Sequence, residues 1–376
     1  MTTGIAMKDS IFFDGDYEGS CIGSVSKLGE DFYSIDLRAD TWYYFNFRMR
    51  GCKGREIIFT FTCREITSPG YSGGMNRWKY ADGHIVAPVV SYDGGKTWEK
   101  TTDIYTGSCI GQYYFRHTYK EDEAIVSFGP MYTYTDLLSY LDGYCKHPEV
   151  TRSSIGKSRC GLDMPRLTIT RNPDAKKCVF VISREDADEF TGSVGLEGML
   201  DYLVSDNDDA RRFLDNYKFE CVPMVSVDGV IAGTTHSAGY GYGGRWWHKE
   251  NAPQEIENVR KLAFELAESG MEFAIAGKFH GGMSLEPVHT IDYMSSSVKL
   301  HRAMRTNTTE FWNPIQTPAV ISSTLTIRPL GYFERFMLDN FELYNVFAVH
   351  VQGTSFDNLR YCGRDLLKAL FAFLEI

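Results

Sequence analysis

The chain has 376 residues, of which 43% are hydrophobic and 23% charged, and its formal net charge at pH 7 is −10. This length and composition are typical of a globular protein with two domains, or one large domain with an extension. The acidic balance argues against nucleic acid or an anionic membrane as the main partner, and no stretch has the length and apolarity of a transmembrane helix.

The cysteines predict neither a zinc ribbon nor a dense disulfide framework. There are nine, scattered along the chain, and none forms a Cys-x-x-Cys pair. Cys178 and Cys221 lie in apolar runs, which is typical of small core residues. Because the N-terminus has no basic-then-apolar signal pattern, the sequence predicts a reducing, cytoplasmic location.

Residues 1–128 are predicted to form an all-β domain. Short aromatic and β-branched stretches alternate with turn residues, which indicates a β-sandwich. The expected strands are Trp42–Arg50, Glu56–Cys63, His84–Tyr92, Tyr113–Tyr119 and Ala124–Phe128. The segment 91–98 resembles the Asp-box hairpin that sialidase propellers repeat. It occurs once here, so it predicts a hairpin and no chemistry.

Residues 129–376 are predicted to form an α/β domain. Strand and helix patterns alternate there, which favours a mostly parallel mixed sheet flanked by helices. A helix is expected from about residue 136 with Thr135 as its N-cap, and others over 207–217, over 253–270 and from Leu359 onward. The expected strands are Arg166–Thr170, Cys178–Ile182, Phe219–Val225, Met271–Ala276 and Val346–Val351.

An acidic turn between Cys178–Ile182 and the next helix is the first candidate site. The strand is apolar throughout, as in strands buried on both faces, and apolar residues return at helical spacing after Gly192. Ligands gather at the carboxyl ends of strands in α/β sheets, and Asp186 and Glu189 can point at one centre from such a turn. The alternative is a solvated acidic loop, with Asp188 placed favourably near a helix N-terminus.

The order of several motifs resembles the zinc carboxypeptidase family, in particular the cytosolic carboxypeptidase branch with an N-terminal β-sandwich. Each motif is weak alone, and the resemblance rests on their order along nearly the whole chain. The motifs are the aromatic strand at Trp42, Tyr132–Leu137, Leu167–Thr170, Val222–Met224 followed by Asp228–Val230, and Phe279–Gly281.

The resemblance implies a metal site with an altered ligand set. The family's first motif is Arg-x-His-Pro-Gly-Glu, and placing Arg184 on its Arg puts Asp186 at the His position and Glu189 at the Glu position. His280 falls on the third ligand. One divalent metal ion is implied, with zinc as the first candidate. The added carboxylate shifts the preference of the site towards Mn²⁺, Mg²⁺ or Ca²⁺. A neutral centre should also acidify bound water less. The alternative is a polar cluster without metal.

The resemblance also implies a site for the carboxylate of a peptide C-terminus. Arg245 falls at the carboxylate-gripping Arg, and Trp246 and Trp247 are candidates for an aromatic wall beside it. His236 lies near the position of the carbonyl-polarising Arg. The alternatives are a surface cation–π stack for Arg245 and a solvated loop histidine for His236.

The catalytic positions depart furthest from the family. Gln352 aligns with the general-base Glu, and an amide cannot accept the proton of a water molecule at neutral pH. General-base catalysis contributes roughly 10²–10⁴ in rate, so hydrolysis is expected to suffer. Tyr332 is matched to the family's mobile Tyr.

Three functions remain open from the sequence. The first is a metallocarboxypeptidase with an altered site, which retains Glu189, His280 and Arg245. The second is an inactive pseudo-carboxypeptidase that binds peptide C-termini or small carboxylates. The third is an assembly role, in which the aromatic β-domain contacts other copies and the protein forms a homo-oligomer.

Overall fold

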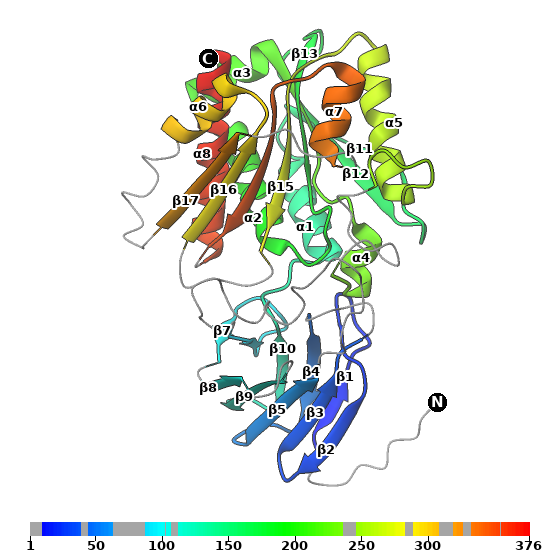
Figure 1. Ribbon diagram of the computed structural model, residues 1–376, viewed down its shortest axis with the longest axis vertical. Coiled ribbons are helices and arrows are strands. Elements are labelled where there is room, and N and C mark those ends of the chain that lie inside the picture. The colour runs from blue at the N-terminus through cyan, green and yellow to red at the C-terminus, as the bar shows by residue number, and fades with distance from the viewer. Residues whose placement is uncertain are drawn as a thin grey trace. The chain divides into compact units, whose positions relative to one another are not determined.

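Most of the chain is described by the computed structural model. It divides into two compact units, Met1–Met131 with Ile231–Thr235 and Tyr132–Val230 with His236–Ile376 (Figure 1). None of the helices it describes is long and apolar enough to cross a membrane. The described residues are 10–38, 44–62, 87–101, 103–106, 112–235, 246–282, 289–307, 319–325, 332–353 and 355–376.

The N-terminal unit consists of two five-stranded sheets, as expected for a sandwich. All strand pairs are antiparallel except β3 with β5. The first sheet contains, in order, β1 (Phe12–Asp14), β4 (Asn46–Arg50), β10 (Glu123–Ser127), β6 (Val89–Ser91) and β7 (Glu99–Lys100). The second contains β2 (Val25–Gly29), β3 (Phe32–Asp36), β5 (Glu56–Thr62), β9 (Gln112–Thr118) and β8 (Asp103–Thr106).

Aromatic rings fill the space between these two sheets. Phe47 of β4 lies 5.4 Å from Phe59 of β5, ring centre to ring centre, and Phe45 stacks on Phe61 at 4.2 Å. All four side chains are fully buried. The aromatic content of this region therefore forms its core, because alternating residues of facing strands point inward.

The Asp-box segment forms the predicted hairpin between β6 and β7. The Asp93 carboxylate accepts hydrogen bonds from the backbone N–H groups of Lys96, at 3.0 Å, and Thr97, at 2.9 Å. These bonds close the turn locally, so the motif has a structural explanation here.

The C-terminal unit contains an eight-stranded mixed sheet in the order β11-β12-β14-β13-β15-β18-β16-β17. The pairs β13–β14, β13–β15, β15–β18 and β16–β17 are parallel, which confirms the predicted mostly parallel sheet. The strands are β11 (Val150–Lys157), β12 (Asp163–Ile169), β13 (Lys177–Ser183), β14 (Tyr217–Val222), β15 (Glu272–Gly281), β16 (His289–Ser295), β17 (Ala319–Leu325) and β18 (Val346–Gln352).

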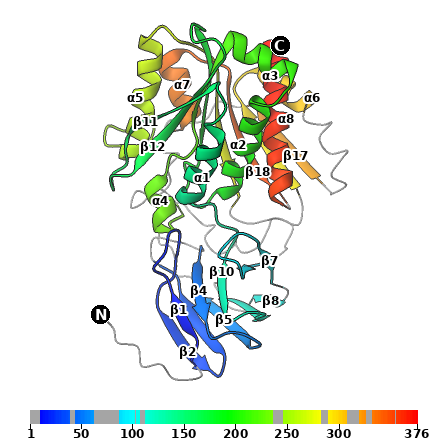
Figure 2. The ribbon, with the colours of Figure 1, turned by 180° about the vertical axis from the view of Figure 1, so that it is seen from behind.

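Helices cover both faces of this sheet, with α1, α2, α3 and α8 on one side and α5 and α7 on the other (Figures 1 and 2). β13 is central, and residues 178–183 are all buried because both of its faces are covered. The described helices are α1 (Tyr134–Tyr144), α2 (Phe190–Leu203), α3 (Asp208–Asn216), α4 (Val227–Ala232), α5 (Gln254–Glu268), α6 (Val298–Asn307), α7 (Phe333–Phe341) and α8 (Phe356–Leu374).

Glycines bring α2 and α8 into backbone contact. A Cβ atom at Gly363 would collide with the carbonyl oxygen of Gly195, and one at Gly198 with that of Arg360. Nearly every residue of α2 is buried as a result, since the helix lies between the sheet and α8.

Some predicted boundaries are wrong. The N-cap of α1 is Thr133 rather than Thr135, because the Thr133 side chain and Asp136 form a reciprocal capping box. β15 runs on to Gly281, so His280 belongs to the strand instead of following it. β16, α6, β17 and α7 were not predicted.

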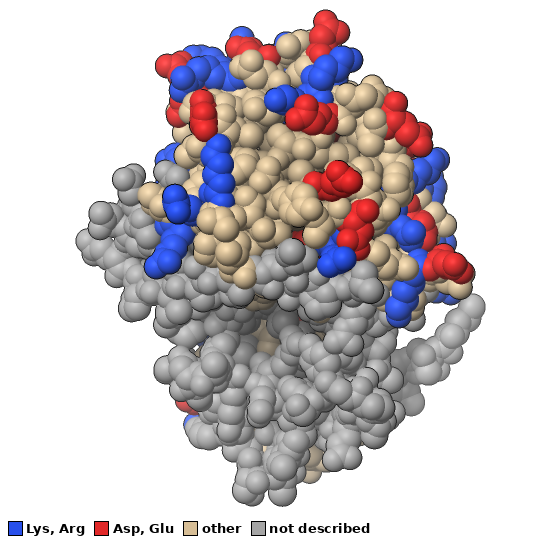
Figure 3. All heavy atoms as spheres, turned by 45° about the horizontal axis from the view of Figure 1, so that its top comes forward, with Lys and Arg blue, Asp and Glu red and all other residues tan. Residues whose placement is uncertain are grey.

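Charged side chains of the described residues are interspersed on the face shown in Figure 3. Acidic and basic residues are scattered over this face, with uncharged residues between them.

Candidate metal centre

The acidic turn between β13 and α2 is held in place by a buried arginine. Arg184 has a positive φ of 57°, a conformation that costs a non-glycine residue about 1–3 kcal/mol. Its guanidinium donates to the carbonyl oxygen of Ala187 at 2.8 Å, to Ser193 Oγ at 3.1 Å and to the carbonyl oxygen of Tyr132 at 3.2 Å. These hydrogen bonds fix the turn between the strand and the helix.

The turn is buried, so the alternative of a solvated acidic loop is wrong. The exposed fraction is 1% for Glu185 and for Asp186, 5% for Asp188 and 8% for Glu189. Buried carboxylates require compensating charge or hydrogen bonds, so their partners define what this turn does.

Close packing between the start of α2 and the end of β15 brings Glu189 to His280. A Cβ atom at Gly192 would lie 2.9 Å from the carbonyl oxygen of His280, and one at Gly281 would collide with the backbone of Gly192. Thr191 Oγ1 also accepts a hydrogen bond from the N–H group of Gly282 at 2.6 Å. Glycine is needed at both positions because the two backbones touch there.

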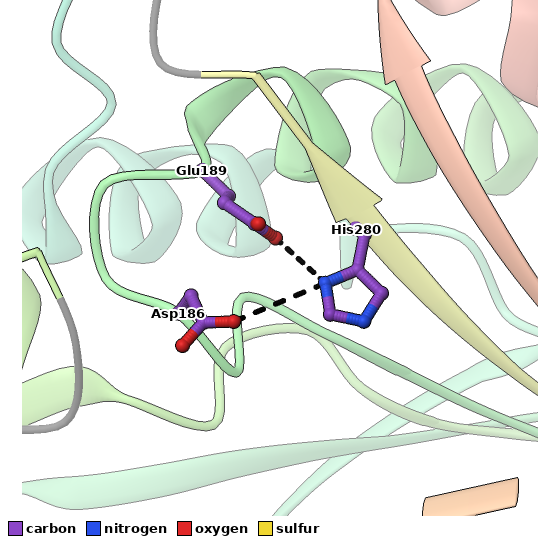
Figure 4. Close-up of side chains that lie close together, drawn as sticks. All are labelled: Asp186, Glu189 and His280. Atoms are coloured by element: carbon purple, nitrogen blue, oxygen red, sulfur yellow. Dashed lines mark hydrogen bonds and ion pairs between the residues drawn. The ribbon is translucent and has the colours of Figure 1, made fainter. Parts of the chain in front are cut away.

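Asp186, Glu189 and His280 form one buried cluster at the carboxyl ends of β13 and β15. One ligand atom from each lies within 4.8 Å of the others. His280 Nδ1 is 2.9 Å from Glu189 Oε2 and 4.0 Å from Asp186 Oδ2, and it faces both carboxylates (Figure 4). Glu189 Oε2 also accepts from the N–H group of Gly281 at 3.1 Å.

The cluster fits a divalent cation by its donors and its spacing. Carboxylate oxygen and imidazole nitrogen are both zinc ligands, and tetrahedral zinc holds such atoms about 3.4 Å apart. The two distances to His280 Nδ1, 2.9 and 4.0 Å, bracket this separation. Burial and the Lys278 ammonium act to lower the pKa of His280, but Glu189 and Asp186 outweigh them and raise it. A proton and a cation therefore compete for one place.

The other predicted site residues are only partly placed. Gln352 is the last residue of β18, and it follows Val351, the partner of Gly281 on β15. Tyr332 is the half-buried N-cap residue of α7. His236 and Arg245 lie outside the described residues.

The two tryptophans have different surroundings. Trp246 is half-buried, and Lys249 Nζ lies 4.2 Å from its ring centre. Trp247 is fully buried against Phe333 and Phe336, at 5.0 and 5.5 Å between ring centres. Trp247 therefore does not form part of an open aromatic wall, because its ring already packs in the core.

A second buried cluster, which was not predicted from the sequence, lies next to the ligands. Lys278 Nζ donates to Glu185 Oε2 at 2.7 Å, and Trp247 Nε1 donates to Glu185 Oε1 at 2.6 Å. A lysine among the apolar residues of β15 was the available signal. Its carboxylate partner is 93 positions away in sequence, so the pattern did not identify it.

A second histidine was also missed. The register of β15 with β18 pairs His280 with His350. Partners on neighbouring parallel strands project from the same face of a sheet, so both histidines belong to the face that carries the cluster. The alternation of Ala348, His350 and Gln352 in β18 was the signal for this.

A mixed sheet with two carboxylates and a histidine at the carboxyl ends of its central strands defines an α/β protein with a candidate metal centre. Residues 137–270 match the model of the zinc carboxypeptidase family.

Curated relatives include bovine (Bos taurus) cytosolic carboxypeptidase 3, 28% identical over 256 residues, which are 60% of this chain and 24% of the relative. Mouse (Mus musculus) cytosolic carboxypeptidase 6 is 25% identical over 309 residues, which are 75% of this chain and 55% of the relative. The chain thus spans about a quarter to a half of the length of these distant relatives.

Solved structures share the fold of both units. A metallo-carboxypeptidase from Burkholderia cenocepacia has a TM-score of 0.76 at 18% identity, covering 97% of this chain and 99% of its own. A metallo-carboxypeptidase from Pseudomonas aeruginosa, solved in complex with (2-guanidinoethylmercapto)succinic acid, has a TM-score of 0.76 at 17% identity, with the same coverage.

Proposed function

We propose that this protein binds one divalent metal ion, with zinc as the first candidate, and that it acts on or binds the C-termini of peptides. The convergence of Asp186, Glu189 and His280 carries the proposal. These residues lie on segments far apart in sequence, and in the fold of a metallocarboxypeptidase they meet at the edge where ligands bind. The names of the curated relatives support a cytoplasmic location.

The three ligands would hold the metal, which when bound supplies a Lewis acid at the mouth of the sheet. Two carboxylates and a neutral imidazole make a formally neutral centre with a divalent ion. Such a centre acidifies water less than a centre with net positive charge. The chain's own residues would exclude bulk solvent, since all three ligands are buried.

Arg245 and Trp246 are proposed to bind the peptide's terminal carboxylate. The guanidinium of Arg245 offers two parallel hydrogen bonds to that group. The Pseudomonas aeruginosa protein, whose bound ligand is a succinic acid derivative, supports a carboxylate as the ligand class. Arg245→Gln should weaken binding of a C-terminal peptide by roughly 10–150-fold, the contribution of a charged hydrogen bond. The same peptide with an amidated C-terminus is the control.

A second candidate is a binding module without hydrolysis, and Gln352 favours it. Gln352 stands at the end of β18, beside the strand of His280, where an amide cannot act as a general base. His236 and Tyr332 are proposed to contact the substrate carbonyl. Neither supplies the missing carboxylate.

Metal analysis and a peptide panel test both candidates together. Protein purified without added metal is measured for bound ions, and peptides are followed for loss of the C-terminal residue with and without a chelator. A stoichiometric ion with chelator-sensitive release supports the enzyme, and an ion with binding but no release supports the module. Absence of both metal and peptide binding contradicts both. Glu189→Gln should abolish metal binding, while Glu268→Gln, on the exposed end of α5, should leave it unchanged.

A further inference from the structure

The Glu185 carboxylate joins three segments that carry the candidate site. It lies directly before Asp186 in the acidic turn. Its Oε2 atom accepts from Lys278 of β15 at 2.7 Å, and its Oε1 atom from the indole N–H of Trp247 at 2.6 Å. Lys278 is two residues before His280, and Trp247 follows Trp246. Both oxygens of one side chain therefore accept hydrogen bonds from residues that lie within two positions of candidate site residues.

This arrangement is fully desolvated. The side chains of Lys278 and Glu185 are 0% and 1% exposed. A second carboxylate, Glu334 of α7, lies 3.8 Å from Lys278 Nζ, and Tyr332 places its ring centre 5.7 Å from the same atom. Within the described chain neither oxygen of Glu334 has a hydrogen-bond partner, so Glu185 is the carboxylate that orients the lysine.

Stability alone does not account for a buried ion pair at this place. Removing two charges from water costs about as much as their attraction returns, and apolar residues of similar volume usually serve as well. What the pair adds is direction, because each hydrogen bond sets an angle as well as a distance. Here the directed bonds end one residue from Asp186 and two from His280.

We propose that Glu185 is a positioning residue of the metal centre, which through Lys278 and Trp247 holds Asp186 opposite His280. The inference rests on the proposed function, because it assumes that the cluster binds metal. Residues that orient metal ligands from behind typically contribute 10–100-fold to metal affinity. Loss of either hydrogen bond should therefore weaken metal binding while the three ligands themselves are intact.

Two variants separate positioning from electrostatics. Glu185→Gln keeps the size of the side chain but leaves one acceptor oxygen for two donors, and it also removes a charge. Trp247→Phe removes the indole donor together with part of a buried ring, and it changes no charge. If Glu185 acted through its charge alone, Trp247→Phe would bind metal as the wild type does.

The test uses Zn²⁺ affinity, from competition with a chromophoric chelator, and the visible absorption of the Co²⁺-loaded full-length protein. We expect both variants to bind Zn²⁺ about 10–100-fold more weakly and to show an altered Co²⁺ spectrum. Phe213→Leu, a buried aromatic of α3 outside this arrangement, should lower the melting temperature and leave both readouts unchanged. If Glu185→Gln does not fold, Trp247→Phe carries the test.

Wild-type affinity and an unchanged Co²⁺ spectrum in Trp247→Phe would overturn the inference and leave the metal site standing. Equal losses in Phe213→Leu would overturn it as well, because any loss of packing would then suffice. A wild-type protein that binds neither Zn²⁺ nor Co²⁺ would overturn this inference together with the proposed function.

Discussion

Glu189 Oε2 and His280 Nδ1, which belong to residues 91 positions apart, are joined by a hydrogen bond of 2.9 Å in the buried end of the sheet. The bond connects Glu189, the residue that precedes α2, to His280, the last residue but one of β15. It occupies the position that a cation would share, so metal binding must replace it. This relationship leads to the first prediction.

Zn²⁺ should stabilise the folded protein. An ion that binds only the folded state raises the free energy of unfolding by about 2.7 kcal/mol at a hundredfold excess over Kd. In a domain of this size, each kcal/mol of added stability raises the melting temperature by about 2–4 °C. Thermal unfolding with Zn²⁺ and with a chelator measures the difference. Glu189→Gln should abolish it and Glu268→Gln should retain it, and a shift that survives Glu189→Gln would show that the ion binds elsewhere.

Restoring the family's residues should raise peptidase activity. Asp186→His supplies a neutral ligand and a more positive centre, and Gln352→Glu supplies a proton acceptor. In the double variant we expect release of C-terminal residues to increase by roughly 10²–10⁴ over the wild type, the contribution of general-base catalysis. Mass spectrometry of a peptide panel measures the release, and the single variants are the controls. A metal-loaded double variant with no gain would show that other losses silence the site.

Stability should fall as the pH rises towards neutrality because of Glu255 at the start of α5. Its side chain is buried, and within the described chain Oε2 has no hydrogen-bond partner. Burial, together with the charge of Asp228, raises its pKa from 4.5 to about 7, although Arg159 opposes this. Asp228 itself accepts hydrogen bonds from Ser158 Oγ at 2.5 Å and from the N–H group of Cys160 at 2.9 Å.

The sign of this effect follows from proton binding. Between pH 4.5 and about 7 the folded protein retains a proton on Glu255 that the unfolded chain has released. The free energy of unfolding therefore decreases with pH across this window, by at most about 1.4 kcal/mol per pH unit from this group. Glu255→Gln should flatten that part of the profile, as measured by urea unfolding at a series of pH values. Glu268→Gln should not, and an unchanged slope in Glu255→Gln would contradict the assignment.

Gly363→Ala should destabilise the C-terminal unit. The added methyl group would collide with the carbonyl oxygen of Gly195 and push α8 away from α2. Overpacking of this kind costs about 1–3 kcal/mol, and more where backbone is the obstacle. Gly143→Ala in α1 is the matched control, since nothing lies within 4 Å of its Cβ position. It should be neutral or stabilise by up to about 1 kcal/mol, as measured by urea unfolding. Equal effects of the two substitutions would contradict the proposed helix contact.

Much of the fold was accessible from sequence because it depends on local patterns. The apolar run Cys178–Ile182 predicts β13, and the return of apolar residues at helical spacing predicts α2. The N-cap of α1 was misplaced by two residues because the reach of the Asp136 side chain, and not the residue type, selects Thr133 over Thr135. The segment 289–341 was left without elements, since its strands are paired mainly through distant partners.

The sequence by itself determined the two-part architecture, the acidic turn and the residue types available to hold a metal, because periodicity and residue chemistry are properties of neighbouring positions. Only the tertiary structure decided that the turn is buried and that Glu189 meets His280. It alone showed that Lys278 lies against Glu185. These contacts join residues more than ninety positions apart, and their geometry depends on strand order and on close backbone packing at Gly192 and Gly281.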